Sequence, residues 1–137
     1  MDRSQSKQVL LIADANPENV RVLKTILAPD YDISVVADGM EAIRLATSPN
    51  PPGLILLNVM MPMPDMYTVC KKLKADKTTK DIPLILLSEP TTEDTEAKGF
   101  ELGAADYITK PFKRSVVRAR IRTHLELKRY RDNLDTR

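Results

Sequence analysis

The sequence predicts a single α/β domain built around a parallel sheet. Short apolar runs recur along the chain, and each is followed by a stretch with the apolar spacing of an amphipathic helix. Two of these runs, LILL at 54–57 and LILL at 84–87, are apolar at every position. Such runs are typical of parallel strands that helices cover on both faces. Five strand–helix units in succession therefore indicate a doubly wound sheet with right-handed crossovers.

Five strands are expected in this sheet. The well-marked ones are Val9–Ala13, Ile33–Ala37, Leu54–Leu57 and Leu84–Leu87. Ala105–Ile108 is a weaker fifth candidate, because it is short and less apolar.

Helix signals lie between the strands. Asn16 is an N-cap residue followed by a proline at the first helical position, and three apolar residues then share one helical face (Val20, Leu23 and Leu27). Asp38 and Glu41 form a capping-box pattern ahead of the second helix. Each of these patterns predicts where a helix begins.

The later helices have similar boundary signals. Asp65 and Thr92 precede the third and fourth helices, and Gly103 is a natural stop for the fourth. The last helix is expected to run from about Phe112 toward Leu134.

Composition is that of one ordinary globular domain. The chain has 137 residues, of which 42% are hydrophobic and 29% charged. No apolar run approaches a membrane span of roughly 18 residues, and the polar start (Met1 to Gln8) is unlike a secretory segment. The single cysteine, Cys70, excludes an intrachain disulfide framework. These features favour a reducing, cytoplasmic location.

The charge is unevenly distributed. Residues 113–137 carry nine Lys or Arg against three Asp or Glu, a net charge of +6, which leaves −4 for residues 1–112. Lys128–Asp132 and Arg131–Asp135 stand at the spacing of helical ion pairs, which suits a solvated helix. The segment has one aromatic residue, Tyr130, and no nucleic-acid reader motif, so we do not expect nucleic-acid binding.

Polar residues follow the predicted strands. In parallel sheets, function is concentrated beyond the C-terminal strand ends. The positions there are Asp14 and Ala15 after the first strand, Asn58 after the third, Ser88 after the fourth and Lys110 after the fifth.

Four segments, in this order and spacing, resemble the receiver domains of two-component response regulators, of the chemotaxis-regulator type. They are LLIADANPEN (10–19), LILLNVMMP (54–62), IPLILLS (82–88) and GAADYITKPF (103–112). The resemblance covers residues 8–125 and implies a flavodoxin-like sheet of order 2-1-3-4-5, flanked by five helices.

The resemblance also implies a phosphorylation site. Members of this family accept a phosphoryl group from a histidine kinase on an aspartate that ends the third strand, and an acidic pair helps that aspartate to hold Mg²⁺. On this pattern Asp14 matches the first acid of the pair, Ser88 and Lys110 match the groups that contact phosphoryl, and Tyr107 matches the aromatic switch position.

Two positions depart from the family pattern. The second acid is Ala15, and the acceptor position is Asn58. A carboxamide is a poor nucleophile, and Mg²⁺ relies on carboxylate ligands. With Asp14 facing Lys110, the formal pocket charge is zero rather than −2. We therefore expect no cofactor and weak Mg²⁺ binding at most, with Asp14 paired to Lys110 or bonded to the Asn58 amide.

The loops next to the pocket also depart from the pattern. Met63 and Met66 stand where the family usually has glycines, which makes positive φ costly there, and Pro62 and Pro64 stiffen the loop. Glu89 stands where the family usually has a small residue. We expect its side chain to be a solvated part of the loop; the alternative is that it supplies a substitute carboxylate at the pocket.

Three other candidates have simple structural explanations. His124 lies on a charged helix without neighbouring metal ligands, so a partly exposed or interface residue is expected. Cys70 is expected to be a small buried residue. The alternative is a reactive thiol, because Lys71 and Lys72 supply neighbouring positive charge. Asp65 is expected to be a helix cap rather than a replacement acceptor.

The expected protein is a pseudo-receiver, meaning a receiver domain that has lost its phosphate acceptor, from a bacterial two-component pathway. It is expected to be non-enzymatic and to act by contacts with a histidine kinase or an output domain, including one on the same chain. Residues 1–125 form the receiver. Residues 126–137 are expected to extend the last helix as a connector or dimerisation helix. Leu127, Tyr130 and Leu134 keep the alternating three- and four-residue spacing of a coiled-coil core. Similar endings occur in receivers that continue into cyclic-di-GMP-handling modules.

Other readings of the chain remain open. The first is a phosphorylatable receiver, with an unconventional acceptor or with Asn58 introduced in the laboratory. The second is an anion-binding module that uses Lys110 and Ser88. A homodimer could form through the face of the fourth helix, fifth strand and last helix, or through the C-terminal helix.

Overall fold

Five parallel strands form one sheet in the order β2-β1-β3-β4-β5. The computed structural model describes residues 7–61, 64–90 and 93–135. The strands are β1 (Val9–Ala13), β2 (Asp32–Val36), β3 (Leu54–Asn58), β4 (Leu84–Ser88) and β5 (Asp106–Thr109). The predicted fold class and strand order are confirmed.

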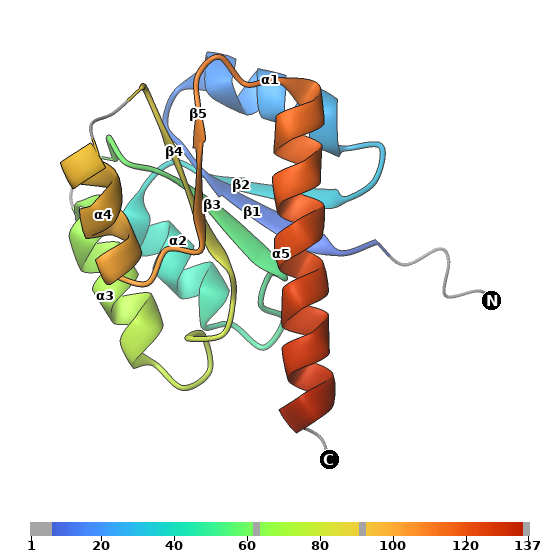
Figure 1. The fold of residues 1–137 in the computed structure, drawn as a ribbon, viewed down its shortest axis with the longest axis vertical. Coiled ribbons are helices and arrows are strands. Elements are labelled where there is room, and N and C mark those ends of the chain that lie inside the picture. The colour runs from blue at the N-terminus through green and yellow to red at the C-terminus, as the bar shows by residue number, and fades with distance from the viewer. Residues whose placement is uncertain (1–6, 62–63, 91–92, 136–137) are drawn as a thin grey trace.

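Five helices alternate with the strands (Figure 1). They are α1 (Pro17–Leu27), α2 (Gly39–Ala46), α3 (Met66–Ala75), α4 (Glu93–Glu101) and α5 (Arg114–Asp135). Among the described residues, no helix is long and apolar enough to cross a membrane.

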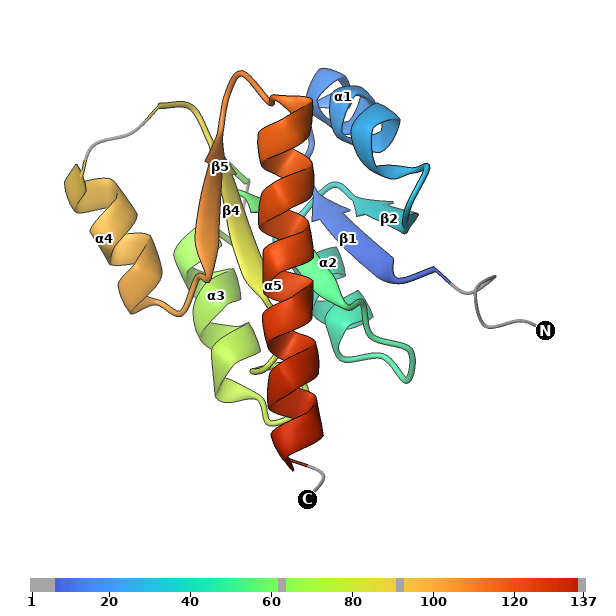
Figure 2. The ribbon, with the colours of Figure 1, turned by 45° about the vertical axis from the view of Figure 1, so that its right-hand side comes forward.

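The sheet is covered on both faces, as the all-apolar strands predict. Alternate strand residues such as Leu56 and Ile85 pack with α1 and α5, which lie side by side (Figure 2). The intervening residues, such as Leu57 and Leu86, pack with α2 and α3 on the other face. Because successive side chains of a strand point to opposite faces, a buried apolar residue is needed at every position.

The predicted N-caps of three helices are confirmed. Asn16 Oδ1 accepts hydrogen bonds from the backbone of Glu18 and Asn19, Asp38 accepts from Glu41, and Asp65 accepts from Thr68. Gly103 has a φ of 104°, as expected of a residue that stops α4.

Several boundaries differ by a residue or two from the prediction. β2 and β5 are displaced by one residue each, β3 and β4 include Asn58 and Ser88, and α5 begins at Arg114 rather than near Phe112. These shifts reflect backbone pairing: Asp32 pairs with Val9 in register, although its side chain carries no apolar signal. Thr92, Pro62, Met63 and the side chain of Asp135 lie outside the described residues.

Candidate functional site

Asp14 is the anchor of a pocket at the C-terminal ends of β1, β3 and β4. Its side chain is buried and accepts three hydrogen bonds. The backbone N–H of Asn16 donates to Oδ1 at 2.9 Å, and the Nδ2 groups of Asn58 and Asn19 donate to Oδ2 at 2.9 and 3.0 Å. Amide donors therefore solvate the buried carboxylate, as a buried charge requires.

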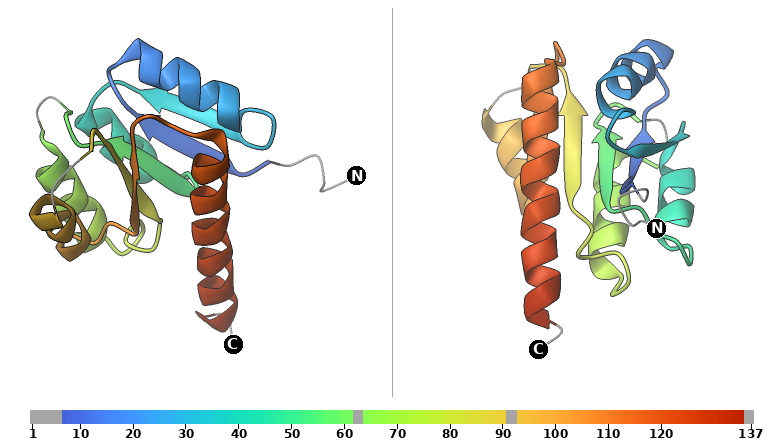
Figure 3. Two further views of the ribbon diagram at one scale, coloured as in Figure 1. Left: turned by 45° about the horizontal axis from the view of Figure 1, so that its top comes forward. Right: turned by 90° about the vertical axis from the view of Figure 1, so that its right-hand side faces the viewer.

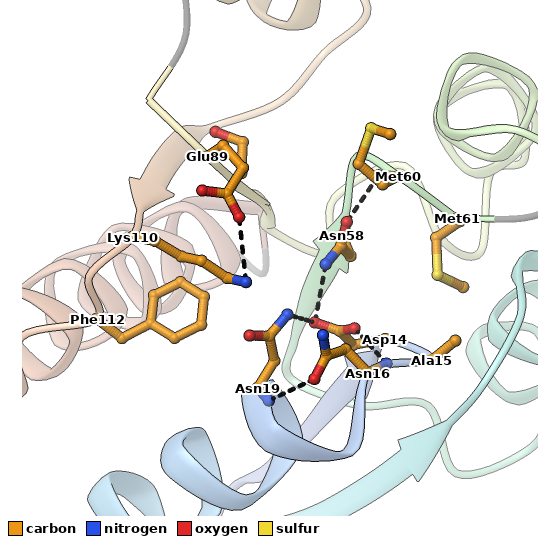
Figure 4. A pocket seen from close by; sticks show the side chains of 11 residues that line it. Asp14, Ala15, Asn16, Asn19, Asn58, Met60, Met61, Glu89, Lys110 and Phe112 are labelled. Carbon is orange, nitrogen blue, oxygen red and sulfur yellow. Dashed lines mark hydrogen bonds and ion pairs between the residues drawn. The ribbon is translucent and has the colours of Figure 1, made fainter.

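Asn58 uses both ends of its carboxamide (Figure 4). Its Nδ2 donates to Asp14, while its Oδ1 accepts the backbone N–H of Met60 at 2.6 Å. A carboxylate could accept from Met60 but could not donate to Asp14. Of the two pairings expected for Asp14, the structure contains the one with the Asn58 amide.

Lys110 pairs with Glu89 rather than with Asp14. Lys110 Nζ lies 3.2 Å from Glu89 Oε2, and both residues line the pocket. The side chain of Glu89 is 68% exposed, as expected of a solvated loop residue, and its carboxylate also pairs with the pocket lysine. Adding Glu89 makes the formal pocket charge −1, rather than the zero expected from Asp14 and Lys110 alone.

Ser88 has an unusual environment. It is 5% exposed, and its Oγ is the one buried side-chain N or O atom in the described part of the chain without a hydrogen-bond partner. It lines the same pocket of about 390 Å³ as Lys110. A buried hydroxyl without a partner costs free energy unless a ligand or water bonds it.

The donor set does not fit Mg²⁺. Both oxygens of Asp14 are engaged by N–H groups, and the methyl side chain of Ala15, at the exposed rim, has no oxygen to offer a metal. No group of three or more His, Cys, Asp or Glu among the described residues is placed to hold a metal ion. Mg²⁺ requires oxygen ligands in near-octahedral geometry, and one carboxylate already surrounded by amide donors is a poor start.

Tyr107, which the resemblance to receiver domains matches to an aromatic switch position, points inward. It is buried, its hydroxyl donates to the carbonyl of Thr95 at 3.1 Å, and burial raises the pKa of its phenol. Gly99 on α4 makes this possible, because a Cβ there would lie 2.1 Å from the Tyr107 hydroxyl. The ring of Phe100 packs edge-on against the ring of Tyr107, with the two ring centroids 5.4 Å apart.

The three residues with simple structural explanations behave as follows. His124 is partly buried, with Nε2 2.9 Å from Asp106 Oδ2, in a contact that its helical position alone did not indicate. Cys70 is buried in the core, and burial raises the pKa of its thiol to about 11. The backbone hydrogen bond from Thr68 lowers the pKa of Asp65, in keeping with a cap.

Within the described residues, three of the seven Lys and Arg side chains of α5 form ion pairs with carboxylates. Arg118 bonds Asp30, Arg120 bonds Asp106, and the predicted Lys128–Asp132 pair is present at 2.7 Å. The predicted partner of Arg131, Asp135, has no described side chain; Arg131 donates to the carbonyl of Asp81 instead.

Two features of the pocket escaped the sequence analysis. Asn19 bonds Asp14, and Phe112 closes one side of the pocket. Asn19 could have been found, since it lies on the first turn of α1, four residues before the buried Leu23, and therefore on the inward face.

Met66 is not strained in a glycine position: it begins α3 in the core, and among the described residues only Gly103 has positive φ.

Comparison with known proteins agrees with this geometry. The model of the response regulator receiver domain family matches residues 10–122. The chain is 38% identical to the response regulator PleD of Caulobacter vibrioides over 129 residues, which is 93% of this chain and 28% of that protein. It is 35% identical to the DNA-binding dual master transcriptional regulator RpaA of Synechocystis, over 86% of this chain and 48% of that protein. It thus spans less than half of either relative.

Solved receiver domains have the same fold. The receiver of a signal transduction histidine kinase from Syntrophus aciditrophicus superposes with a TM-score of 0.76 at 34% identity, over 87% of this chain and 90% of that one. The receiver of the sensor histidine kinase PA1611 from Pseudomonas aeruginosa, with Mg²⁺ in its active-site cleft, has a TM-score of 0.79 at 25% identity, over 88% of this chain and 99% of that one. This chain belongs to the response regulator receiver domain family of two-component signalling.

Proposed function

We propose that this receiver domain signals without being phosphorylated. The observation that carries the proposal is the Asn58 carboxamide, which donates to Asp14 and accepts from Met60. At that place the phosphotransfer chemistry of the family needs an anionic oxygen and a metal site. Asn58 supplies neither, and its amide bonds the Asp14 carboxylate without them.

Function then rests on protein contacts, in the cytoplasm and without enzymatic activity. A second hollow of about 390 Å³ lies between α4, β5 and α5, lined by Phe100, Tyr107, Val116 and Arg120 among others. Phe100 and Val116 are partly exposed there. This mixed apolar and charged hollow suits a protein partner such as a histidine kinase or an output domain. Residues 126–137 would link the receiver to such a module.

Intact mass spectrometry after treatment with acetyl phosphate and Mg²⁺ tests the proposal. We expect no phosphoryl adduct on the natural chain. The variant that carries Ala15→Asp and Asn58→Asp is the positive control, because it restores both missing carboxylates. An adduct on the natural chain would contradict the proposal and reveal an unconventional acceptor, which peptide mapping would locate.

A second candidate function is anion binding, favoured by the unpartnered Oγ of Ser88. An oxyanion between Ser88 and Lys110 would bond that hydroxyl and face a cation. Glu89 already holds Lys110 and competes with the anion.

Thermal unfolding in phosphate or sulfate, against chloride at equal ionic strength, tests this candidate. We expect a higher midpoint with the oxyanions. Glu89→Gln should increase the shift, and Ser88→Ala should abolish it. Equal midpoints in all salts would exclude the anion site.

A further inference from the structure

The C-terminal half of α5 has an apolar stripe that its own domain does not cover. Leu127, Tyr130 and Leu134 are 54%, 68% and 62% exposed. The buried residues of the helix lie on the other side (Val117, Ile121 and Leu125). At 100° per residue the two sets face roughly opposite directions. The stripe is called the α5 seam below, and in Figure 3 its end of the helix extends past the rest of the domain.

The spacing of the seam is that of a two-stranded coiled coil. The intervals from Leu127 to Tyr130 and from Tyr130 to Leu134 are three and four residues, as for successive core positions of a heptad. Seven residues before Leu127, the same heptad register places the charged Arg120, whose guanidinium pairs with Asp106 at 2.7 Å. The α5 seam is therefore confined to the last turns of the helix.

Two opposite charges flank the seam. Glu126 lies on one side and Arg131 on the other, five residues later; both are exposed, and Arg131 also donates to the carbonyl of Asp81 at 3.1 Å. Lys128 and Asp132 lie on the side that faces the domain and pair with each other. In a parallel, in-register coiled coil, the residue before one core position faces the residue five positions later on the partner helix. Glu126 would thus meet Arg131 of the second helix, twice by symmetry.

The antiparallel arrangement lacks this complementarity. It brings equivalent flanking positions together, so that Glu126 faces Glu126 and Arg131 faces Arg131. Like charges at such positions disfavour a pairing. The charge pattern therefore favours a second copy of this helix as the partner, in the parallel orientation.

We propose that the α5 seam pairs with the seam of a second copy of this chain, as a short, parallel, in-register coiled coil. The pairing is independent of the phosphorylation state of the pocket, and so of the function proposed above. With three core positions on each helix the dimer is weak and depends on protein concentration. It would hold the C-terminal ends of two chains next to each other.

Sedimentation equilibrium of the 137-residue chain over a wide concentration range tests the pairing. We expect a monomer–dimer equilibrium. Leu127→Asp should raise the dissociation constant about tenfold or more, because it places a carboxylate in the core of the seam. Met40→Asp is the matched control: Met40 is 63% exposed on α2, and its replacement should leave the equilibrium unchanged. Circular dichroism verifies that both variants fold.

Charge reversal tests the register. Glu126→Arg and Arg131→Glu should each weaken the dimer, and the double variant should restore it. Leu134→Cys should form an intermolecular disulfide on oxidation, because equivalent core positions meet only in the parallel register; Cys70 is buried and should not interfere.

Three results would overturn the proposal. They are a natural chain that stays monomeric at millimolar concentration, a double charge reversal that stays as weak as the single variants, and a Met40→Asp dimer that is weakened as much as Leu127→Asp.

Discussion

Restoring the acceptor carboxylate, Asn58→Asp, should destabilise the domain in the absence of metal. In the natural chain Asn58 Nδ2 donates to Asp14 Oδ2 at 2.9 Å. In the variant a carboxylate oxygen takes the place of that donor. Two charges at 2.9 Å repel by about 6 kcal/mol at an effective dielectric constant of ~20.

The full repulsion will not be measured. The new carboxyl can take up a proton, which at about pH 7.5 costs roughly 5 kcal/mol for a group whose ordinary pKa is near 4. The partly exposed side chain of residue 58 can also turn away from Asp14. We therefore expect the free energy of unfolding to fall by about 2–4 kcal/mol at neutral pH.

The pH dependence has a defined sign. The carboxyl introduced at residue 58 has a folded-state pKa raised above its unfolded value by the neighbouring carboxylate. Its proton stabilises the fold at pH below the unfolded pKa, and this contribution is lost as the pH rises through the folded pKa. The variant should therefore approach the natural chain in stability near pH 4 and differ most above neutrality.

Urea unfolding followed by circular dichroism measures both effects. Asn58→Ala is the control, since it removes the hydrogen bond without adding a charge, and its deficit should not change with pH in this way. Millimolar Mg²⁺ should recover part of the stability of Asn58→Asp and none of that of Asn58→Ala. If Asn58→Asp is as stable as the natural chain at neutral pH without metal, the described contact between residues 58 and 14 is incorrect.

Three further predictions concern groups around the pocket and in the core. Asn19→Ala should cost about 1–3 kcal/mol of unfolding free energy by urea titration, because Asp14 loses a buried donor; an unchanged stability would contradict the role of Asn19. Gly99→Ala should cost about 1–3 kcal/mol, because its Cβ meets the Tyr107 hydroxyl, and the cost should shrink in a Tyr107→Phe background. Cys70, whose pKa is raised to about 11, should stabilise the fold below the unfolded thiol pKa and lose that contribution as the pH rises through 11. Natural and Cys70→Ala chains should therefore converge in urea stability between about pH 9 and 11, and a constant difference would refute the shift.

The strands and the site positions could be predicted from the sequence because both follow from local patterns. A run such as LILL is specific for a strand that is buried on both faces, and the residue after it must lie at the edge of the sheet. Asp14, Asn58, Ser88 and Lys110 were located in this way, and the structure brings all of them to one pocket.

The contacts within the pocket could not be predicted in the same way. The Glu89–Lys110 pair depends on the path of the loop after β4, and the His124–Asp106 contact depends on the rotation of α5 against β5. Neither leaves a periodic signal in the sequence. Whether the Asp14 carboxylate bonds Lys110 or Asn58 likewise depends on distances that are set by the whole sheet.

Thermal unfolding of the natural chain with and without millimolar Mg²⁺ and beryllofluoride, a mimic of the bound phosphoryl group, tests most directly whether the pocket has lost its phosphorylation chemistry. The variant with Ala15→Asp and Asn58→Asp serves as the positive control. A ligand that binds only the folded state raises the midpoint. We predict no Mg²⁺-dependent shift for the natural chain and a clear one for the control; a clear shift in the natural chain would contradict the claim that Asn58 and Ala15 have removed the phosphorylation chemistry.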